Sequence, residues 1–557
     1  MRRLQAGVFA LFFCWSFITS AEQAPQQAYV SSAHPLASAA GIAVLEQGGN
    51  AIDAAIAVTA ALAVVEPYGS GLGGGGFYLL RQAGKHPSYR FLDARERAPL
   101  AAHADLYRQD GVVNPKLSLD GALAAAIPGI PAALAALSQQ HSKLPLATNL
   151  APAIALASDG FAVDALYQER AGWRLAALQN DPESARIFLA QQAIPPQGWR
   201  LRQPELANTL SMLAEQGGNS FYQGAFAKQL VQAVQQAGGI WSLKDLADYQ
   251  VQWRAPLIVP LAEQRQLITA PPPSAGGIAI AQSLLMLQRL PWQQAEPAQR
   301  AHYLAEVFKR AYRDRGLLGD PDFIDNPTQA LLARQHIVQM ANSIQVDQAT
   351  PSANLAPSRA LQEGDHTTHF AVLDQQGNAV AATLSLNMMF GAAFTVPGTG
   401  VLLNDEMDDF AADQQGSNAY GLTGSAANSV QAGKRPLSSM SPSFLESPTD
   451  FAAFGTPGGS RIPSMNVLAM LEYLDGKTPA QWVASARVHH QYLPDVLGFE
   501  PGSLSQQQQQ RLQSQGHQLQ ELTRNYGNQQ VLWWNKTSGK SSAASDPRGQ
   551  GVSLSHE

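Results

Sequence analysis

Two adjacent threonines, Thr367 and Thr368, open an alternating run of residues more than three hundred positions into the chain. A threonine that begins a chain is a nucleophile, because its own α-amine can act as the base for its hydroxyl. An internal threonine lacks that amine. Thr367 can therefore do this chemistry only if the chain is cut between His366 and Thr367. Taken alone, two threonines at the start of a strand reflect ordinary β-propensity.

The residues after Thr367 predict a β-hairpin. The runs THFAVLD and AVAATLSLN flank the turn signal QQGN, so the hairpin is centred near Gln376. In this register Thr367 lies opposite Ser385, and Asn387 lies on the same face two residues further on. A hydroxyl and an amide then flank the threonine. A slip of one residue would turn these side chains to the other face, so the prediction depends on the register.

Two later segments offer groups that could bind a charged substrate. LLNDEMDDF places Glu406, Asp408 and Asp409 just after a predicted strand, either as a solvated acidic turn or as a site for an ammonium group. KRPLSSMSPS holds Ser438 and Ser439 between two prolines. Rigid hydroxyls and backbone N–H groups there could hold a carboxylate, and an ordinary turn is the alternative.

Two glycine-rich segments have different interpretations. GTPGGSRIP leads from a predicted strand into a helix predicted over 463–474, and its backbone N–H groups could meet at one point, as an oxyanion requires. A plain strand-to-helix turn is equally compatible with it. The run at 69–76 contains G-x-G-x-x-G but follows a predicted buried helix over 50–66, capped by Asn50, and precedes a strand. That order excludes a dinucleotide site and predicts a tight turn with close backbone contact.

Composition limits the class of protein. The chain has 557 residues, of which 45% are hydrophobic and 14% charged, which is typical of a well-buried enzyme-sized protein. A net charge of −6 without a basic run argues against nucleic-acid binding. Residues 1–21 form a charged start, a short apolar run and a small-residue end, which predicts a cleaved signal peptide, export to the periplasm or medium, and no membrane span. Cys14 is the only cysteine and lies in that segment, so the exported chain has no thiol.

The remaining chain predicts one globular unit without a metal site. Residues 121–343 are mostly helical in pattern, and 343–366 form a polar aperiodic stretch, either functional or disordered. The glutamines at 506–510 predict an exposed helix. No G-x-S-x-G, H-E-x-x-H, C-x-x-C or complete P-loop occurs, and none of the twelve histidines has metal-ligand spacing.

Taken together, these segments resemble the γ-glutamyltranspeptidases, also called glutathione hydrolases. The resemblance covers nearly the whole chain after residue 21. It rests on motifs in the family's order: SSAHPLASAAGIAVLEQGGNAIDAAIA, VVEPYGSGLGGGGFYLL, FLDARERAP, APPPSAGG, LGDPDF, TTHFAVLDQQGNAVA, LLNDEMDDF, RPLSSMSP, GTPGGSRI and ASDPR.

The resemblance implies an α/β fold, the four-layer αββα sandwich of the N-terminal nucleophile hydrolases. It implies a precursor that cuts itself into a large subunit, 22–366, and a small subunit, 367–557, which stay together as a heterodimer. Thr367 would become the nucleophile. Ser385 stands where the family usually has a supporting threonine, a departure that keeps the hydroxyl.

The resemblance also implies roles for residues around the substrate. They would hold the α-carboxylate and the α-ammonium of a γ-glutamyl group, stabilise the oxyanion and cover the pocket. In that order they are Arg95 with Ser438 and Ser439; Asn387, Glu406 and Asp409; Gly458 and Gly459; and Tyr420 on a lid loop.

The implied substrates are glutathione and other γ-glutamyl compounds, with water, amino acids or dipeptides as acceptors and no metal or cofactor. Two alternatives remain. One is an acylase of the same superfamily that acts on glutaryl-cephalosporin side chains, which would need no ammonium site, so Arg95 and the acidic cluster argue against it. The other is a periplasmic amino-acid or peptide-binding protein without catalysis.

Overall fold

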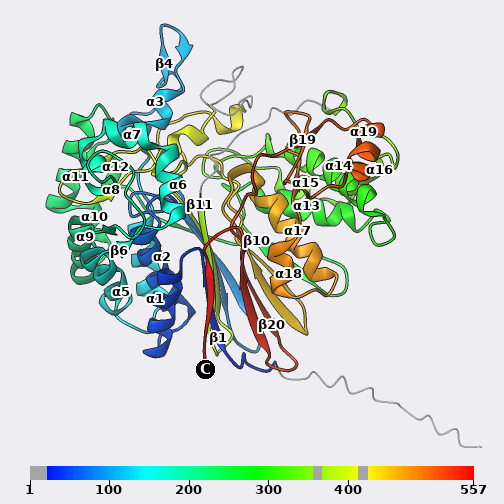
Figure 1. The fold of residues 1–557 in the computed structure, drawn as a ribbon, viewed down its shortest axis with the longest axis horizontal. Helices are drawn as coiled ribbons and strands as arrows, with labels where there is room; N and C mark the ends of the chain where they lie inside the picture. The colour runs from blue at the N-terminus through cyan, green and yellow to red at the C-terminus, as the bar shows by residue number, and fades with distance from the viewer. Residues whose placement is uncertain (1–21, 356–366, 412–424) are drawn as a thin grey trace, which may run out of the picture.

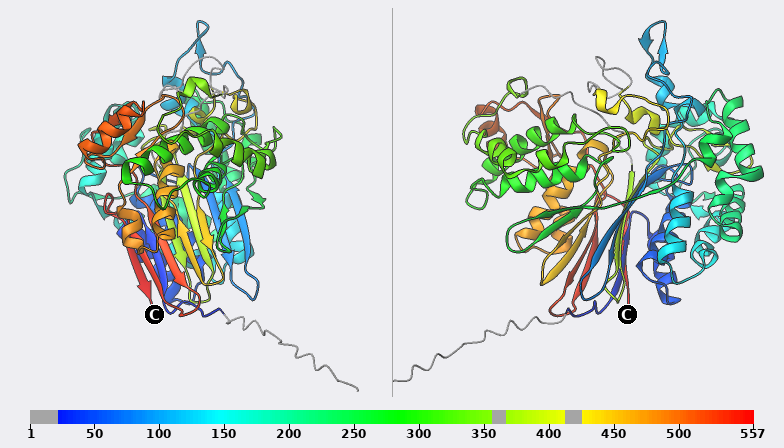
Figure 2. Two further views of the ribbon diagram at one scale, coloured as in Figure 1. Left: turned by 90° about the vertical axis from the view of Figure 1, so that its right-hand side faces the viewer. Right: turned by 180° about the vertical axis from the view of Figure 1, so that it is seen from behind.

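The computed structural model describes residues 22–355, 367–411 and 425–557. Two antiparallel sheets pack face to face, and helices cover the outer face of each sheet (Figures 1 and 2). The layers follow in the order helix, sheet, sheet, helix. This arrangement confirms the αββα sandwich.

Within the described residues the first sheet has seven strands and the second has six. In spatial order the first sheet contains β22 (Val552–His556), β1 (Ala28–Ser32), β11 (Thr367–Leu373), β12 (Ala379–Ser385), β2 (Gly75–Gln82), β3 (Ser88–Ala94) and β8 (Gln252–Arg254). The second contains β21 (Ser541–Ser545), β20 (Gln530–Asn535), β16 (Asp450–Phe454), β15 (Ser443–Glu446), β10 (Gln266–Thr269) and β9 (Leu257–Pro260). Shorter ribbons are formed by β4 (Arg108–Gln109) with β5 (Val112–Val113), β6 (Phe161–Ala162) with β7 (Arg200–Leu201), β13 (Thr395–Val396) with β14 (Val401–Leu402), and β17 (Val488–His489) with β18 (Leu497–Phe499) and β19 (Leu519–Glu521).

Each sheet has its own layer of helices. Those on the first sheet are α1 (Pro35–Glu46), α2 (Ala51–Val65), α4 (Ile130–His141), α5 (Leu146–Asp159), α6 (Ala165–Trp173), α7 (Leu175–Asn180), α8 (Pro182–Phe188), α9 (Pro204–Gln216), α10 (Asn219–Tyr222), α11 (Gly224–Gln236) and α12 (Leu243–Ala247). Those on the second are α13 (Gly276–Leu287), α14 (Pro297–Arg315), α16 (Arg334–Asn342), α17 (Ile462–Leu474), α18 (Pro479–Ala484) and α19 (Gln506–Ser514). Two short helices, α3 (Lys116–Leu119) and α15 (Thr328–Leu331), lie in the connections.

The alternation of side chains along β11 decides which way the threonines point. Phe370 packs in the core between the first sheet and its helices, whereas Ala371 packs in the core between the two sheets. Side chains two residues apart on a strand share a face. Thr367 and His369 therefore face the second sheet.

The hairpin register is the one that the sequence predicts. Thr367 pairs with Ser385 across β11 and β12, and Ser385 pairs with Gly75 on β2. Gly76, also on β2, pairs with Ala94, the last residue of β3. Arg95 therefore follows at the same end of the sheet. The predicted nucleophile, its supporting hydroxyl and Arg95 thus lie at the same end of the first sheet, where these strands begin or end.

The predicted buried helix and glycine turn are also confirmed. Every residue of α2 is buried, and Asn50 caps its start in a capping box with Asp53. Asp53 can lie inside the core because its carboxylate accepts hydrogen bonds from the Lys143 N–H and the Asn149 side chain. After α2, a Cβ placed on Gly73 would lie 2.0 Å from the Leu402 carbonyl oxygen, so the backbones do approach closely there.

Some features differ from the sequence pattern or lie beyond the described residues. The mostly helical region 121–343 also supplies the edge strands β8 and β9 and the neighbouring strand β10, which are too short to show a clear alternation. The exposed glutamine-rich helix is confirmed as α19. Residues 1–21 and 356–366, which carry the signal-peptide and cleavage-loop predictions, are outside the described residues. In the described part of the chain no helix is long and apolar enough to cross a membrane.

We expect Gly455→Ala to destabilise the sandwich by about 3 kcal/mol or more. A Cβ on Gly455 would lie 2.0 Å from the His369 ring, which is fully buried and bonded to Thr383 Oγ1 at 2.8 Å. Overpacked cores lose about 1–3 kcal/mol, sometimes more, and a fully buried ring cannot move out into solvent. Denaturant melts of the variant measure the loss. Gly84→Ala is the control, because its nearest neighbour would lie 3.8 Å away. Equal stability of the two variants would contradict this account of the packing.

Candidate active site

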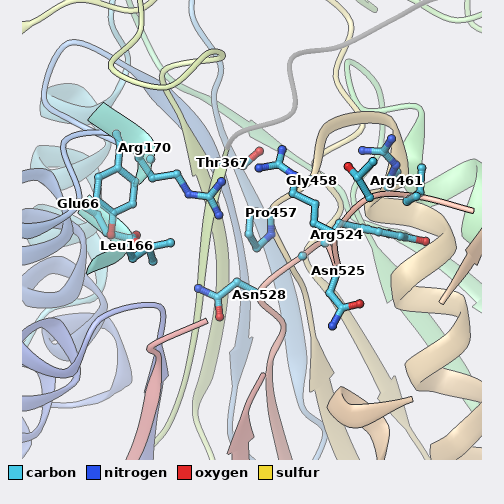
Figure 3. Close-up of a pocket in the computed structure, with 16 residues that line it drawn as sticks. Glu66, Leu166, Arg170, Thr367, Pro457, Gly458, Arg461, Arg524, Asn525 and Asn528 are labelled. Atoms are coloured by element: carbon cyan, nitrogen blue, oxygen red, sulfur yellow. The ribbon is translucent and has the colours of Figure 1, made fainter. Parts of the chain in front are cut away.

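Thr367 opens β11 at the edge of a cavity of about 250 Å³ (Figure 3). Its side chain is only partly buried, whereas the rest of β11 is buried. The cavity is lined by residues from several distant parts of the chain: Glu66, Tyr68, Gly69, Leu166, Arg170, Thr367, Pro457, Gly458, Arg461 and 522–528. A hydroxyl at the end of a buried strand is thus open to a ligand-sized space.

Ser385 lies opposite Thr367, as expected, and Asn387 adjoins Ser385. Ser385 Oγ accepts a hydrogen bond from the Asn387 backbone N–H at 2.8 Å. Asn387 has φ of +73°, a conformation that asparagine tolerates better than most residues. Its side-chain amide donates to the Asp405 carbonyl at 3.0 Å. Burial raises the pKa of Asp405 well above its ordinary value. Asp405 was not singled out from the sequence, although it belongs to LLNDEMDDF.

The acidic cluster is buried rather than solvated. Arg95 Nη1 donates to Glu406 Oε1 at 2.6 Å, and Arg95 Nη2 forms a short contact with Asp409. Arg95 itself is 1% exposed. Burying three charged groups is costly unless they pair, and here they do. This excludes the interpretation of the segment as an exposed acidic turn. Asp408 has a separate partner, Ser118 Oγ at 2.6 Å.

The predicted serines adjoin this cluster. Arg95 also donates from Nε to the Pro436 carbonyl at 3.1 Å and from Nη2 to the Leu437 carbonyl at 3.3 Å. Ser438 and Ser439 follow directly in the chain and are buried. Among the described residues Ser439 Oγ has no hydrogen-bond partner, so this hydroxyl can still bind a ligand.

The structure does not place the charged cluster on the wall of the Thr367 cavity. Arg95, Glu406 and Asp409 are absent from the described residues that line it. Arg95 follows β3, three strands from β11, which is about 14 Å at the usual strand spacing. Tyr420, the predicted lid residue, is outside the described residues.

The glycine motif reaches the cavity beside Thr367. Gly458 lines the cavity with φ of +136°, a conformation that favours glycine. Gly459 begins a 3₁₀ turn, Gly459–Arg461, that leads into α17. The glycines therefore lie where a helix begins, with backbone N–H groups that tend to attract negative charge. Gly458 adjoins the nucleophile, whereas Gly459 does not line the cavity.

Glu66 is a cavity residue that the sequence analysis missed. It ends α2, is 4% exposed, and accepts a hydrogen bond from Thr368 Oγ1 at 2.6 Å. Burial raises its pKa to about 7, against the lowering effect of the Thr368 bond. A carboxyl at the end of a buried, mostly apolar helix is a signal that could have revealed it.

Three arginines were also missed. Arg461 lies within GTPGGSRIP, so its motif was recognised but not its role. Arg170 and Arg524 lie in segments without a motif, and only the fold brings them to the cavity. In the described part of the chain no group of three or more histidine, cysteine or acidic side chains could hold a metal ion.

The layers of the sandwich and the threonine at the start of a central strand define the N-terminal nucleophile hydrolase class. The sequence profile of the gamma-glutamyltranspeptidase family matches residues 37–555. The glutathione hydrolase proenzyme of Escherichia coli strain K12 is 39% identical over 86% of this chain and 84% of that protein. The one of Bacillus subtilis strain 168 is 34% identical over 80% and 77%. The chain therefore belongs to the gamma-glutamyltranspeptidase family, and it is an enzyme of that family.

Solved structures agree with this assignment. A cephalosporin acylase from Bacillus halodurans superimposes with a TM-score of 0.83 at 26% identity, covering 98% of this chain and 99% of that one. The γ-glutamyltranspeptidase of Helicobacter pylori has a TM-score of 0.56 at 35% identity, and its matched chain covers 58% of this chain and 94% of its own length.

We expect Glu66 to make the protein less stable as pH rises. Its pKa is about 7 in the folded chain and 4.5 without burial, so the folded state holds the proton that the unfolded state releases between these values. Stability from this group is present below about pH 4.5 and is lost as pH rises through 7, by up to about 3 kcal/mol.

The variant Glu66→Gln removes the titration. We expect it to match the wild type at pH 4, below both pKa values, and to exceed its melting temperature at pH 8. Glu263→Gln is the control, because the Glu263 side chain is 76% exposed. If wild type and Glu66→Gln keep the same difference in melting temperature at both pH values, Glu66 does not titrate in this range.

Proposed function

We propose that this enzyme hydrolyses glutathione and related γ-glutamyl compounds and transfers the γ-glutamyl group to amino acids or dipeptides. The observation that carries the proposal is the position of Thr367, which opens a central strand and faces a cavity beside Gly458. Relatives named glutathione hydrolase proenzyme, with 39% identity over most of both chains, support the same activity.

The protein is made as a precursor with an export signal at 1–21, which directs it to the periplasm or the medium. Thr367 Oγ1 attacks the His366 carbonyl carbon, and the peptide nitrogen of Thr367 leaves as an amine. Water then hydrolyses the ester. The products are the large subunit, 22–366, and the small subunit, 367–557, which remain one globular unit because strands of both subunits pair with each other in the first sheet.

The new α-amine is the base for catalysis. It takes the proton of the Thr367 hydroxyl as Oγ1 attacks the γ-carbonyl of glutathione. Backbone N–H groups of Gly458 and Gly459 stabilise the oxyanion, and Ser385 supports the nucleophile from the paired strand. Cysteinylglycine leaves with the proton, giving a γ-glutamyl ester. Water or an amino group then releases the acyl group.

The buried ion cluster recognises the glutamyl head. The α-carboxylate of the substrate accepts hydrogen bonds from the Arg95 guanidinium. The α-ammonium donates to the carboxylates of Glu406 and Asp409, which are then no longer bonded to Arg95. Positive and negative charges therefore stay balanced as the substrate enters. The proposed ammonium ligands are Asn387, Glu406 and Asp409; Ser438 and Ser439 assist at the carboxylate, and Tyr420 covers the pocket.

The second candidate is a glutaryl- or cephalosporin-type acylase. The full-length superposition with the cephalosporin acylase of Bacillus halodurans favours it. A glutaryl group lacks the ammonium, however, and would leave Glu406 and Asp409 without a ligand. The buried acidic pair therefore favours the γ-glutamyl substrate. A non-catalytic binding protein is the least favoured alternative, because family membership makes the chain an enzyme.

The variant Thr367→Ala tests cleavage and catalysis together. Both steps use the same oxygen. We therefore expect a single uncut chain on denaturing gels and no γ-glutamyl transfer in activity assays. Thr367→Ser should cut more slowly and keep some activity. The neighbouring Thr368→Ser is the control and should cut normally. Cleavage of the alanine variant at this bond in the absence of proteases, or full activity of the uncut chain, would refute the proposal.

The variant Asp409→Asn separates the two candidate substrates. We expect kcat/KM for γ-glutamyl-p-nitroanilide to fall about a hundredfold, since a charge-assisted contact contributes about 1.5–3 kcal/mol. Turnover of glutaryl-p-nitroanilide, which has no ammonium, should change little. Asp408→Asn is the matched control, because Asp408 bonds Ser118 and not Arg95. Equal losses on both substrates would remove Asp409 from ammonium recognition.

A further inference from the structure

Thr367 lies between two charged regions on opposite sides of β11. The Arg95 cluster follows β3, on the side of β12 and β2. The cavity extends toward the other side, where β1 and β22 lie. Its wall residue Tyr68 accepts a hydrogen bond from Gln550, which lies two residues before β22. If the acyl group of the substrate binds toward Arg95, the cavity remains available for the leaving group on the other side of the scissile bond.

This cavity is strongly cationic. Among the described residues that line it are three arginines, Arg170, Arg461 and Arg524, and one carboxyl group, that of Glu66. Figure 3 shows Arg170 entering from the α6 side, with Arg461 and Arg524 on the opposite side. Because burial raises the pKa of Glu66 to about 7, this carboxyl is only partly ionised near neutral pH and offsets less than one of the three positive charges.

Two of these arginines are held against one indole ring. The guanidinium carbon of Arg170 lies 4.4 Å from the centre of the Trp173 ring, and that of Arg524 lies 3.8 Å from it. Cation–π contacts fix the planes of guanidinium groups without using their N–H donors. Both side chains are thus positioned and remain able to donate hydrogen bonds. We call Arg170, Arg524 and Trp173 the arginine clamp.

The clamp has little anionic compensation from the protein. Among the described residues the Arg170 guanidinium has no hydrogen bond or ion pair. Burial lowers its pKa; the charge of Glu169 opposes this effect, and the nearby charge of Arg524 adds to it. Arg524 has an ion pair with Glu169 at 3.7 Å, but both side chains are almost half exposed, so this pair is weak. A bound anion would relieve the repulsion between the two arginines.

We propose that the arginine clamp binds the C-terminal carboxylate of the peptide on the leaving-group side of Thr367, both the peptide released from the donor and a peptide that accepts the acyl group. Guanidinium groups recognise carboxylates through paired N–H donors. The clamp therefore selects donors and acceptors with a free carboxylate over amides and neutral leaving groups. The inference rests on the proposed γ-glutamyl transfer at Thr367.

The test compares donors that differ only beyond the scissile bond. Glutathione carries the carboxylate, glutathione with a C-terminal amide lacks it, and γ-glutamyl-p-nitroanilide has a neutral leaving group. We expect the wild type to prefer glutathione over its amide. In Arg170→Gln and Arg524→Gln the KM for glutathione should rise about tenfold or more with kcat little changed, and the preference should disappear. Hydrolysis of γ-glutamyl-p-nitroanilide should be unaffected.

Arg186→Gln is the control, because Arg186 is a partly exposed arginine paired with Glu183 away from the cavity. Arg524→Lys keeps the charge and should retain part of the preference. If the two glutamine variants still prefer the free carboxylate, or lose activity equally on all three donors, the clamp does not bind it. If the wild type fails to hydrolyse γ-glutamyl-p-nitroanilide, the proposed function itself fails, which is a separate outcome.

Discussion

The pairing of β11 with β12 in the middle of the first sheet is the constraint on which the site depends. It fixes Thr367 opposite Ser385 and turns both toward the space between the sheets. Because side chains alternate along a strand, a shift of one residue would move Thr367 into the helix-packed core and remove it from the cavity. The neighbouring strands β1 and β12 hold this register from both sides, and the buried cores on both faces make a slip costly.

Close packing at the end of the sheet gives the site its shape. Glycines at the turn after α2 and in the 455–459 segment let backbones and the His369 ring approach more closely than any Cβ would allow. At this end of the sheet the start of β11, the start of α17 and the glycine turn after α2 pack closely together. Polar groups buried there, such as Asn387 on Asp405, are positioned by hydrogen bonds rather than by apolar contacts alone.

The electrostatic arrangement divides the site in two. On one side Arg95 is neutralised by Glu406 and Asp409, so a zwitterion can exchange with an existing ion pair at little cost in net charge. On the other side Arg170 and Arg524 face the cavity with weak compensation. A substrate with a zwitterionic head and an anionic tail complements both sides. The nucleophile lies between them, where the two ends of such a substrate would place the bond to be broken.

Local sequence determined what depends on neighbouring residues: the β11–β12 hairpin and its register, the buried helix capped by Asn50, the glycine turn after it, and the strand-to-helix motif at Gly458. Periodicity and turn chemistry act over short distances, so they are legible in one sequence. Tertiary structure decided what depends on distant segments. Only the fold shows that the acidic segment is buried on Arg95, that Glu66 bonds Thr368, and that Arg170 and Arg524 meet at one tryptophan. Apart from the local contact of Arg170 with Trp173, these contacts join residues more than three hundred positions apart. No local pattern encodes them, because they exist only once both sheets and their helices have packed.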